Sequence, residues 1–359
     1  MIANYKINNL KFLYNFFLLV SLIIYFFSTT QAQGKAFDID NIEISRPFEM
    51  NFNKNEVLDD GFRKAFLELL LLIVNSSDQK KISKVQLNEI KGMIESFSIK
   101  EEKFIDETYF VNLGVSFNKK KIFNYLEKRN IFPSIPIEKK ILFIPIVIEE
   151  KKKNLLNFYK NKVFNEWNND IQNFHLIQYI LPTEDLEDLN LIKKNFEFIE
   201  QYDFKDVTEK YSLDDSIILL IFKDGERLRI LSRININDNL ILKNKSFNDV
   251  DIDDDGNLKK IINNLKTTYE DYWKNINQVN TSIRLTLNIK VKNKDNIKIS
   301  NFETILNEKD LIYDFHISKF DKDFVYYQII FNGTPNNFLK SMSHHDYTFD
   351  TQNKLWILK

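Results

Sequence analysis

The spacing of apolar residues changes along the chain and predicts its first structural unit. Residues 55–74 include "GFRKAFLELLLLIV", which is apolar on more than one helical face and predicts a helix buried between layers. In residues 108–117 every odd-numbered side chain is apolar, which predicts a strand with one buried face. Weaker patterns predict strands near 42–48 and 97–104, a helix near 85–96, and a helix from a cap at Asn118 to Lys128. These elements predict an α/β unit over residues 36–135.

A second unit is predicted over residues 136–280. "ILFIPIVIEE" is continuously apolar, which predicts a strand buried on both faces of a sheet. A helix near 154–168, a strand near 175–182 and short helices follow. Asp224-Gly225 predicts the turn of a hairpin that leads into a third strand. We therefore expect an α/β sheet with a terminal β-meander, closed by a long amphipathic helix over 258–279.

The last unit, residues 281–359, has the most regular pattern. Residues 283–291 alternate between apolar and polar and predict a half-buried strand. Ser300 to Glu303 match a capping box at the start of a helix. Two strands, a helix beginning near Pro335 and a final strand follow. The order β-α-β-β-α-β predicts a ferredoxin-like unit, so the fold class of the whole chain is α+β or α/β.

Residues 1–32 have the layout of a secretory signal peptide. Two lysines precede an apolar core at 16–27, and small residues end at Ala32, where signal peptidase would cleave. This core is shorter than the ~20 residues of a membrane-spanning helix. We expect a protein secreted across the inner membrane into the periplasm, in contact with the membrane only through this leader. The alternative is an inner-membrane anchor formed by residues 12–27.

Composition excludes several functional classes. Lys and Arg number 50 against 51 Asp and Glu, so no net charge draws the chain to nucleic acid. The absence of cysteine excludes thiol catalysis, disulfides and cysteine metal sites. The nearest glycines, Gly92 and Gly114, are too far apart for a phosphate-binding loop or a nucleophile elbow. We therefore expect no cofactor.

The stretch "DIDDDG" resembles the first half of a calcium loop. Asp251, Asp253 and Asp255 would supply ligands at positions one, three and five, with a glycine at position six. Position twelve, which requires a bidentate glutamate, is Ile262, and position nine is Lys259. The pattern therefore favours an acidic helix N-terminus, whose carboxylates accept backbone N–H bonds. Weak calcium binding by the three aspartates is the alternative.

A second acidic segment, "LPTEDLEDL" at Leu181–Leu189, follows a predicted strand. Asp185 and Asp188 could perform acid/base chemistry in a cleft, at the end of the sheet where α/β proteins bind ligands. The spacing of Leu186 and Leu189 instead favours a short surface turn with its acids outward. Trp167 is the aromatic candidate for a ligand contact, although its place on a helix favours a core role.

Several of these segments together resemble a family of proteobacterial envelope proteins, domain of unknown function 2066. "FRKAFLELLLLIVNSS" is similar to its early helix at Phe62, Arg63 and Ala65, and "LGVSFNKKKIFNYLEKRNIFP" to its "LxVxFDxxxLxxxLxxxxxP" pattern. "LPTEDLEDL" matches "LPxxDLEDL" at every specified position. The resemblance spans nearly all of the chain after the leader. It implies an envelope location, but the family has no established activity.

The expected function is therefore a non-enzymatic binding or assembly module of the cell envelope. Its partner would be another envelope protein, bound at surfaces or sheet edges of the small α/β units. The alternative is a hydrolase or small-ligand binder that acts on an envelope glycan or peptide through the Leu181–Leu189 segment.

Overall fold

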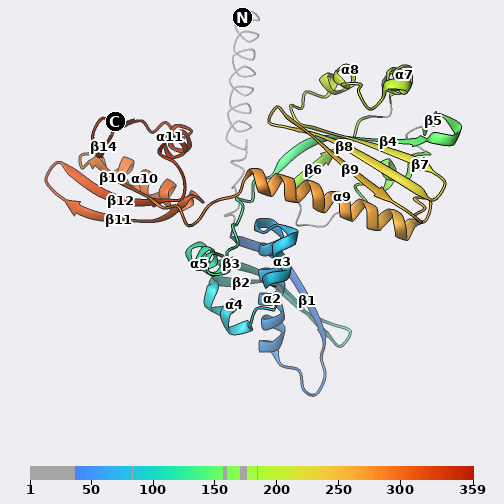
Figure 1. Cartoon of the computed structure of the whole chain (residues 1–359). Coiled ribbons are helices and arrows are strands. Elements are labelled where there is room, and N and C mark those ends of the chain that lie inside the picture. Colours follow the sequence, from blue (N-terminus) through green and yellow to red (C-terminus); the bar gives the residue numbers. More distant parts are fainter. Residues whose placement is uncertain (1–36, 83, 157–159, 170–175, 184) are drawn as a thin grey trace, which may run out of the picture.

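The computed structural model describes residues 37–82, 84–156, 160–169, 176–183 and 185–359. The predicted leader, His175 and Glu184 lie outside these residues. Within them the strands form three separate sheets, and helices pack against each (Figure 1). The predicted mixed α and β class is confirmed. In the described part of the chain no helix is long and apolar enough to cross a membrane.

The N-terminal unit packs its helices on one face of an antiparallel sheet with the strand order β1-β3-β2. The odd-numbered side chains of β3 are buried against α2, as the alternation predicts. Asn118 caps α5 by accepting a hydrogen bond from the N–H of Lys121, also as predicted. The elements are β1 (Asp38–Pro47), α2 (Lys54–Ile73), α3 (Ser76–Ile82), α4 (Leu87–Met93), β2 (Ile94–Ile105), β3 (Thr108–Phe117) and α5 (Lys119–Glu127).

The middle unit has a mixed sheet that is covered on both faces along β4 and β7, whereas Leu240 and Leu242 of β9 are exposed on one face. The strand order is β5-β4-β7-β8-β9, and β6 pairs in parallel with the first half of β4. Alternate residues of β4 enter two different cores, one under α9 and the other under α7 and α8. The strands are β4 (Lys139–Glu149), β5 (Asn154–Leu155), β6 (Ile177–Ile180), β7 (Ser216–Asp224), β8 (Arg227–Ile236) and β9 (Asn239–Phe247). The helices are α6 (Lys162–Glu166), α7 (Leu186–Lys194), α8 (Lys205–Thr208) and α9 (Asp255–Ile276), with short 3₁₀ turns η3 (Phe196–Phe198) and η4 (Glu209–Tyr211).

The C-terminal unit follows the predicted order until its last strands. Its sheet has the order β11-β12-β10-β14-β13, and β14 runs parallel to β10. A single strand after α11 would run antiparallel to β10, but the short strand β13 first reverses the chain. The ferredoxin-like detail is therefore not confirmed. The elements are β10 (Leu285–Lys292), α10 (Asn296–Glu308), β11 (Ile312–Phe320), β12 (Phe324–Phe331), α11 (Pro335–Ser343), β13 (Phe349–Asp350) and β14 (Leu355–Leu358).

Three local predictions are wrong. Helix α2 is not buried between layers, because it packs on one face of the sheet and leaves Leu67 and Leu71 exposed. The helix predicted over 154–168 is reduced to α6, because the chain first forms β5 along the end of β4. The helix of the C-terminal unit begins before the predicted capping box, and Asp295 caps it by accepting from the N–H of Lys298. The predicted cap, Ser300, lies inside the helix.

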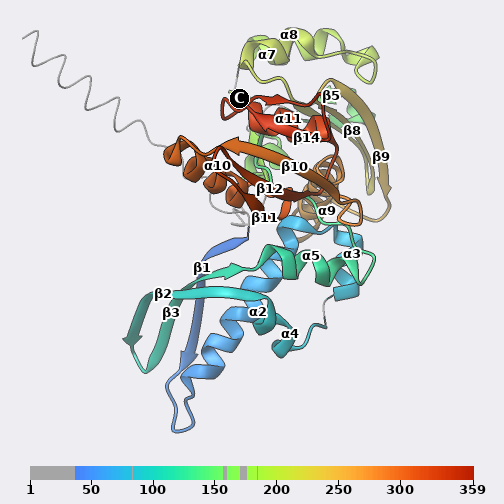
Figure 2. The same ribbon diagram turned by 90° about the vertical axis from the view of Figure 1, so that its left-hand side faces the viewer.

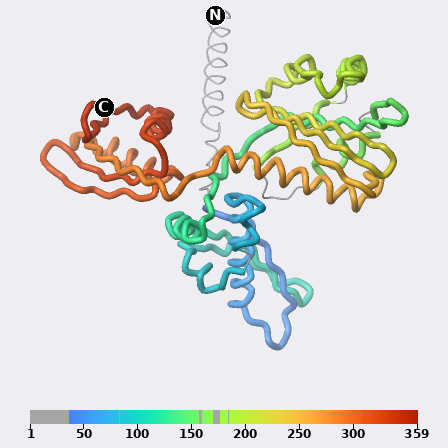
Figure 3. Tube along the Cα trace, in the orientation of Figure 1, coloured from blue at the N-terminus to red at the C-terminus, as the bar shows by residue number. Residues whose placement is uncertain are grey.

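The three units meet where α9 ends, as the path of the chain shows (Figure 3). The segment that follows α5 passes between the ends of α2 and α9, and Ser134 donates its N–H to Ile73 O. Lys274 of α9 is buried and donates to the carbonyl oxygens of Leu71 and Val74 at the end of α2. The C-terminal unit contacts α5 through ion pairs, including Arg284 with Glu127 at 2.7 Å.

Candidate functional site

The acidic segment at Leu181–Leu189 forms the start of α7. Asp185 caps this helix by accepting from the N–H of Glu187, and Asp188 is buried. Asp188 accepts from Lys210 Nζ at 2.7 Å and from Tyr211 Oη at 3.0 Å. The expectation that all these acids point outward is therefore wrong for Asp188.

Lys210 organises the carboxylates of this segment. Its ammonium also lies 3.3 Å from Glu187 and 3.9 Å from Asp185, and hydrogen bonding to Asp188 is the main reason that the pKa of Lys210 is raised. The buried Asp188 carboxylate thus has a hydrogen-bond donor at each of its two oxygens. The geometry ties α7 to η4 and leaves no free pair of carboxylates for acid/base chemistry within the described residues of the segment.

The three aspartates of the calcium-like loop are held by lysines. Lys223 Nζ contacts Asp251 at 3.2 Å and Asp253 at 2.5 Å, and Lys162 Nζ contacts Asp255 at 2.9 Å. The pKa of Asp251 lies below its usual range. The main cause is a hydrogen bond from the N–H of Asp253, and the second is the hydrogen bond from Lys223. Among the described residues no group of three or more acidic, histidine or cysteine side chains could hold a metal ion.

The same loop begins α9. Asp254, between two of the predicted ligands, caps the helix by accepting from the N–H of Asn257. The carboxylates therefore satisfy backbone N–H groups and ammonium groups, as an acidic helix N-terminus does. This geometry does not fit a calcium loop, because ammonium groups lie where a cation would bind.

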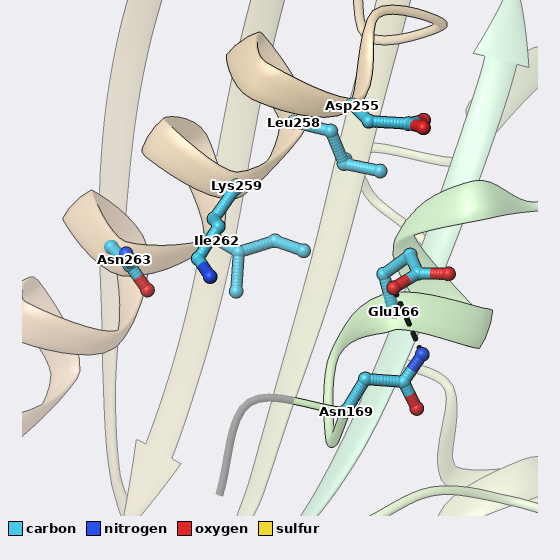
Figure 4. Close-up of a pocket in the computed structure, with 7 residues that line it drawn as sticks. All are labelled: Glu166, Asn169, Asp255, Leu258, Lys259, Ile262 and Asn263. Atoms are coloured by element: carbon cyan, nitrogen blue, oxygen red, sulfur yellow. Dashed lines mark hydrogen bonds between the residues drawn. The ribbon is translucent and has the colours of Figure 1, made fainter. Parts of the chain in front are cut away.

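Trp167 belongs to the core of the middle unit and is fully buried. Its ring stacks on Phe143, with ring centroids 3.9 Å apart, and meets Tyr179 edge-on. It therefore offers no surface to a ligand. A hollow of about 280 Å³ does lie nearby, between α6 and α9. Figure 4 shows Leu258 and Ile262 on one side of this hollow and Glu166, hydrogen-bonded to Asn169, on the other.

A second concave surface lies on the N-terminal sheet. Helix α2 covers one face of this sheet, and the opposite face is the open face. A hollow of about 470 Å³ lies mainly on the open face and extends around the edge strand β1, where Lys64 of α2 donates to Glu43 O at 3.1 Å. Strand register places its side chains in rows across β1, β3 and β2. One row is Glu43, Asn112 and Glu101, and the next is Ser45, Phe110 and Lys103.

The hollow combines an apolar floor with unused polar groups. Phe110 is 41% exposed and Ile105 is 50% exposed. The side-chain oxygen of Asn112 is buried and has no hydrogen-bond partner among the described residues. Glu101 is paired with Lys103, whereas no ion pair reaches Glu43 from the described residues. The hollow can therefore bind a group that is partly apolar and carries hydrogen-bond donors.

One end of the open face is closed by an ion pair across β3. Asp40 of β1 and Lys100 of β2 meet at 2.6 Å above Gly114. A Cβ at this glycine would lie 2.7 Å from the Asp40 carboxylate, so any side chain here would displace the pair. The glycine thus shapes the surface and does not serve a tight turn.

Sequence reasoning did not identify the open face. In the sequence, the feature that pointed to this face was Phe110, an aromatic residue among the even-numbered, otherwise polar or small positions of residues 108–117. Comparison of the chain with models of known protein families and with curated proteins finds no match to either. The resemblance to the envelope family described above therefore stays a prediction.

Proposed function

We propose that this protein is a non-enzymatic binding or assembly module of the cell envelope, and that its N-terminal sheet receives a segment of a partner protein. The observation that carries the proposal is the open face, with its exposed Phe110 and the unpartnered amide oxygen of Asn112. A partner side chain with an apolar stem and an N–H donor would complement both groups.

The neighbouring units support a binding role for this face. Lys274 fixes α2 against α9, and Lys120 of α5 pairs with Asp314 of the C-terminal unit at 2.9 Å. Because α2 forms the back of the N-terminal sheet, the Lys274 contacts join the unit behind the open face to the middle unit.

Chemical crosslinking in intact envelopes tests the proposal with three forms of the full chain. The unchanged protein should yield a complex with one partner at fixed stoichiometry. Phe110→Glu places a charge on the apolar floor and should reduce the yield of this complex at least tenfold. Ile297→Glu, at a position of α10 that is 75% exposed, should leave it unchanged. Recovery of only uncomplexed protein would contradict the proposal.

Cell fractionation tests the location. We expect the mature chain in the periplasmic fraction, with an N-terminus after Ala32. An intact leader on protein in the cytosol would contradict an envelope function, whereas an intact leader in the inner membrane would support the anchored alternative.

A further inference from the structure

The end of the N-terminal unit farthest from the other units has a distinct composition. The connection between β1 and α2 and the hairpin between β2 and β3 both project away from the middle and C-terminal units (Figures 1 and 2). The N–H of Phe48 donates to Glu107 O at 2.7 Å and joins these loops. We call the surface formed by Phe48, Glu49, Met50, Phe104, Asp106 and Glu107 the distal tip.

The centre of the distal tip is apolar and highly exposed. Met50 is fully exposed, and the exposed fractions of Phe48 and Phe104 are 52% and 57%. The rings of Phe48 and Phe104 meet edge-on, with their centroids 4.8 Å apart. The ring centroids of Phe48 and Phe52 are also 4.8 Å apart. Phe52 in turn packs on the buried Tyr109. The exposed rings are therefore held in place, which lowers the entropic cost of binding.

Carboxylates surround this apolar centre. Glu49, Asp106 and Glu107 are exposed, and within the described residues no cation pairs with them. The nearby lysines are engaged elsewhere, since Lys54 pairs with Glu102 and Lys103 with Glu101. An apolar centre with a polar rim is typical of protein interfaces, and here the unbalanced charge of the rim is negative.

The hairpin keeps one of its acids, Glu107, in an unfavourable backbone conformation. Asp106 and Glu107 have φ values of 48° and 57°, so both lie in the left-handed region of a two-residue turn. Such turns favour Asn-Gly or Asp-Gly, and glutamate adopts this conformation at an energetic cost. The hairpin between β8 and β9 has the same geometry with the more tolerant Asn237 and Asp238.

We propose that the distal tip binds a basic amphipathic segment of a partner protein. This inference rests on the proposed function and adds a second contact surface, at the end of the same unit and with its own chemistry. Apolar side chains of the partner cover Phe48, Met50 and Phe104, while its lysines or arginines pair with the three carboxylates. An anionic lipid surface is a poor occupant, because the same carboxylates repel it.

The test places a photoreactive phenylalanine analogue at Met50 in the full chain, with Ile297 as the control position, and irradiates intact envelopes. We expect an adduct at Met50, at least tenfold above the control. Mass spectrometry should place it in a protein segment that is apolar and has more lysine and arginine than acidic residues. Adducts with lipid, with a second copy of this chain or with an acidic segment would each overturn the proposal.

A double substitution, Asp106→Asn with Glu107→Gly, separates binding from folding. It supplies the turn's preferred residues and removes two carboxylates, so the melting temperature should rise by roughly 2–4 °C. The Met50 adduct should fall at least fivefold, and an unchanged yield would overturn the proposal. If chemical crosslinking still recovers a partner complex but Met50 forms no adduct, only the tip inference fails. If no complex forms at all, the proposed function fails with it.

Discussion

The N-terminal and middle sheets differ in how many of their faces are covered. In the middle sheet, alternate residues of β4 enter separate cores, with Phe143 under α9 and Ile144 on the side of α7 and α8. In the N-terminal sheet only one face of β3 is buried, and Phe110 stays exposed on the other. Where both faces of a sheet are buried, as along β4 and β7, the sheet contributes stability but presents no face to a partner. The uncovered sheet has a face available for binding.

This comparison predicts unequal effects for matched substitutions. Phe143→Ala should lower the free energy of unfolding by about 3–5 kcal/mol, because it removes a fully buried ring stacked on Trp167. Urea denaturation followed by circular dichroism measures the change. The matched control is Phe110→Ala on the open face, which removes the same ring from an exposed position and should cost far less. Equal losses would show that the open face is covered in solution.

The contact between α2 and α9 through Lys274 should contribute nearly as much to the free energy of unfolding. Lys274→Ala removes the ammonium group that binds Leu71 O and Val74 O and leaves both carbonyls in a buried position. Because buried acceptors without partners are costly, we expect a loss of about 2–4 kcal/mol. Calorimetry should also show the N-terminal and middle units unfolding in separate transitions. Lys260→Ala, on the exposed side of α9, is the control and should preserve one transition.

The N-terminal unit also contains a buried acid that weakens it. Glu68 of α2 is 5% exposed, and its Oε2 has no hydrogen-bond partner. Burial raises the pKa of Glu68 to about 7, although the charge of Lys64 acts in the opposite direction. Between pH 4.5 and 7 the folded state keeps a proton that the unfolded state releases. Stability should therefore fall as the pH rises through this window.

Glu68→Gln should remove that dependence. At pH 8 the variant should be more stable than the unchanged protein by about 1–3 kcal/mol, and at pH 4 the two should be nearly equal. Urea denaturation at both pH values measures the difference. Glu95→Gln, at an exposed position, should change neither value. A variant that is equally stabilised at both pH values would show that packing and not charge is responsible.

The long periodic segments were predictable from sequence, and the short ones were not. Strand β3 has strict apolar alternation, helix α2 has a long apolar run, and a local side chain, Asn118, marks the start of α5. The strands β5 and β13 each have two residues, too few for any period to show. They depend on pairing with a neighbour that lies elsewhere in the sequence.

The candidate sites were less predictable, because their character depends on distant partners. Asp188 resembles a surface acid until Lys210 and Tyr211, more than twenty residues later, are brought beside it. Asp251 and Asp253 resemble metal ligands until Lys223 of a neighbouring hairpin occupies the space between them. Spacing identifies acids that lie close together, but it does not show which cations the fold places against them.

The smallest effect on stability should come from the open face, where the effect on binding should be large. Phe110→Ser removes an exposed ring flanked by Ser45 and Lys103 and should change the free energy of unfolding by less than about 0.5 kcal/mol. The crosslinked complex should nevertheless fall at least fivefold, because the apolar floor of the hollow is lost. Urea denaturation and crosslinking of the same preparation measure both. A large loss of stability with unchanged binding would assign Phe110 to the core and remove the distinction between the two sheets.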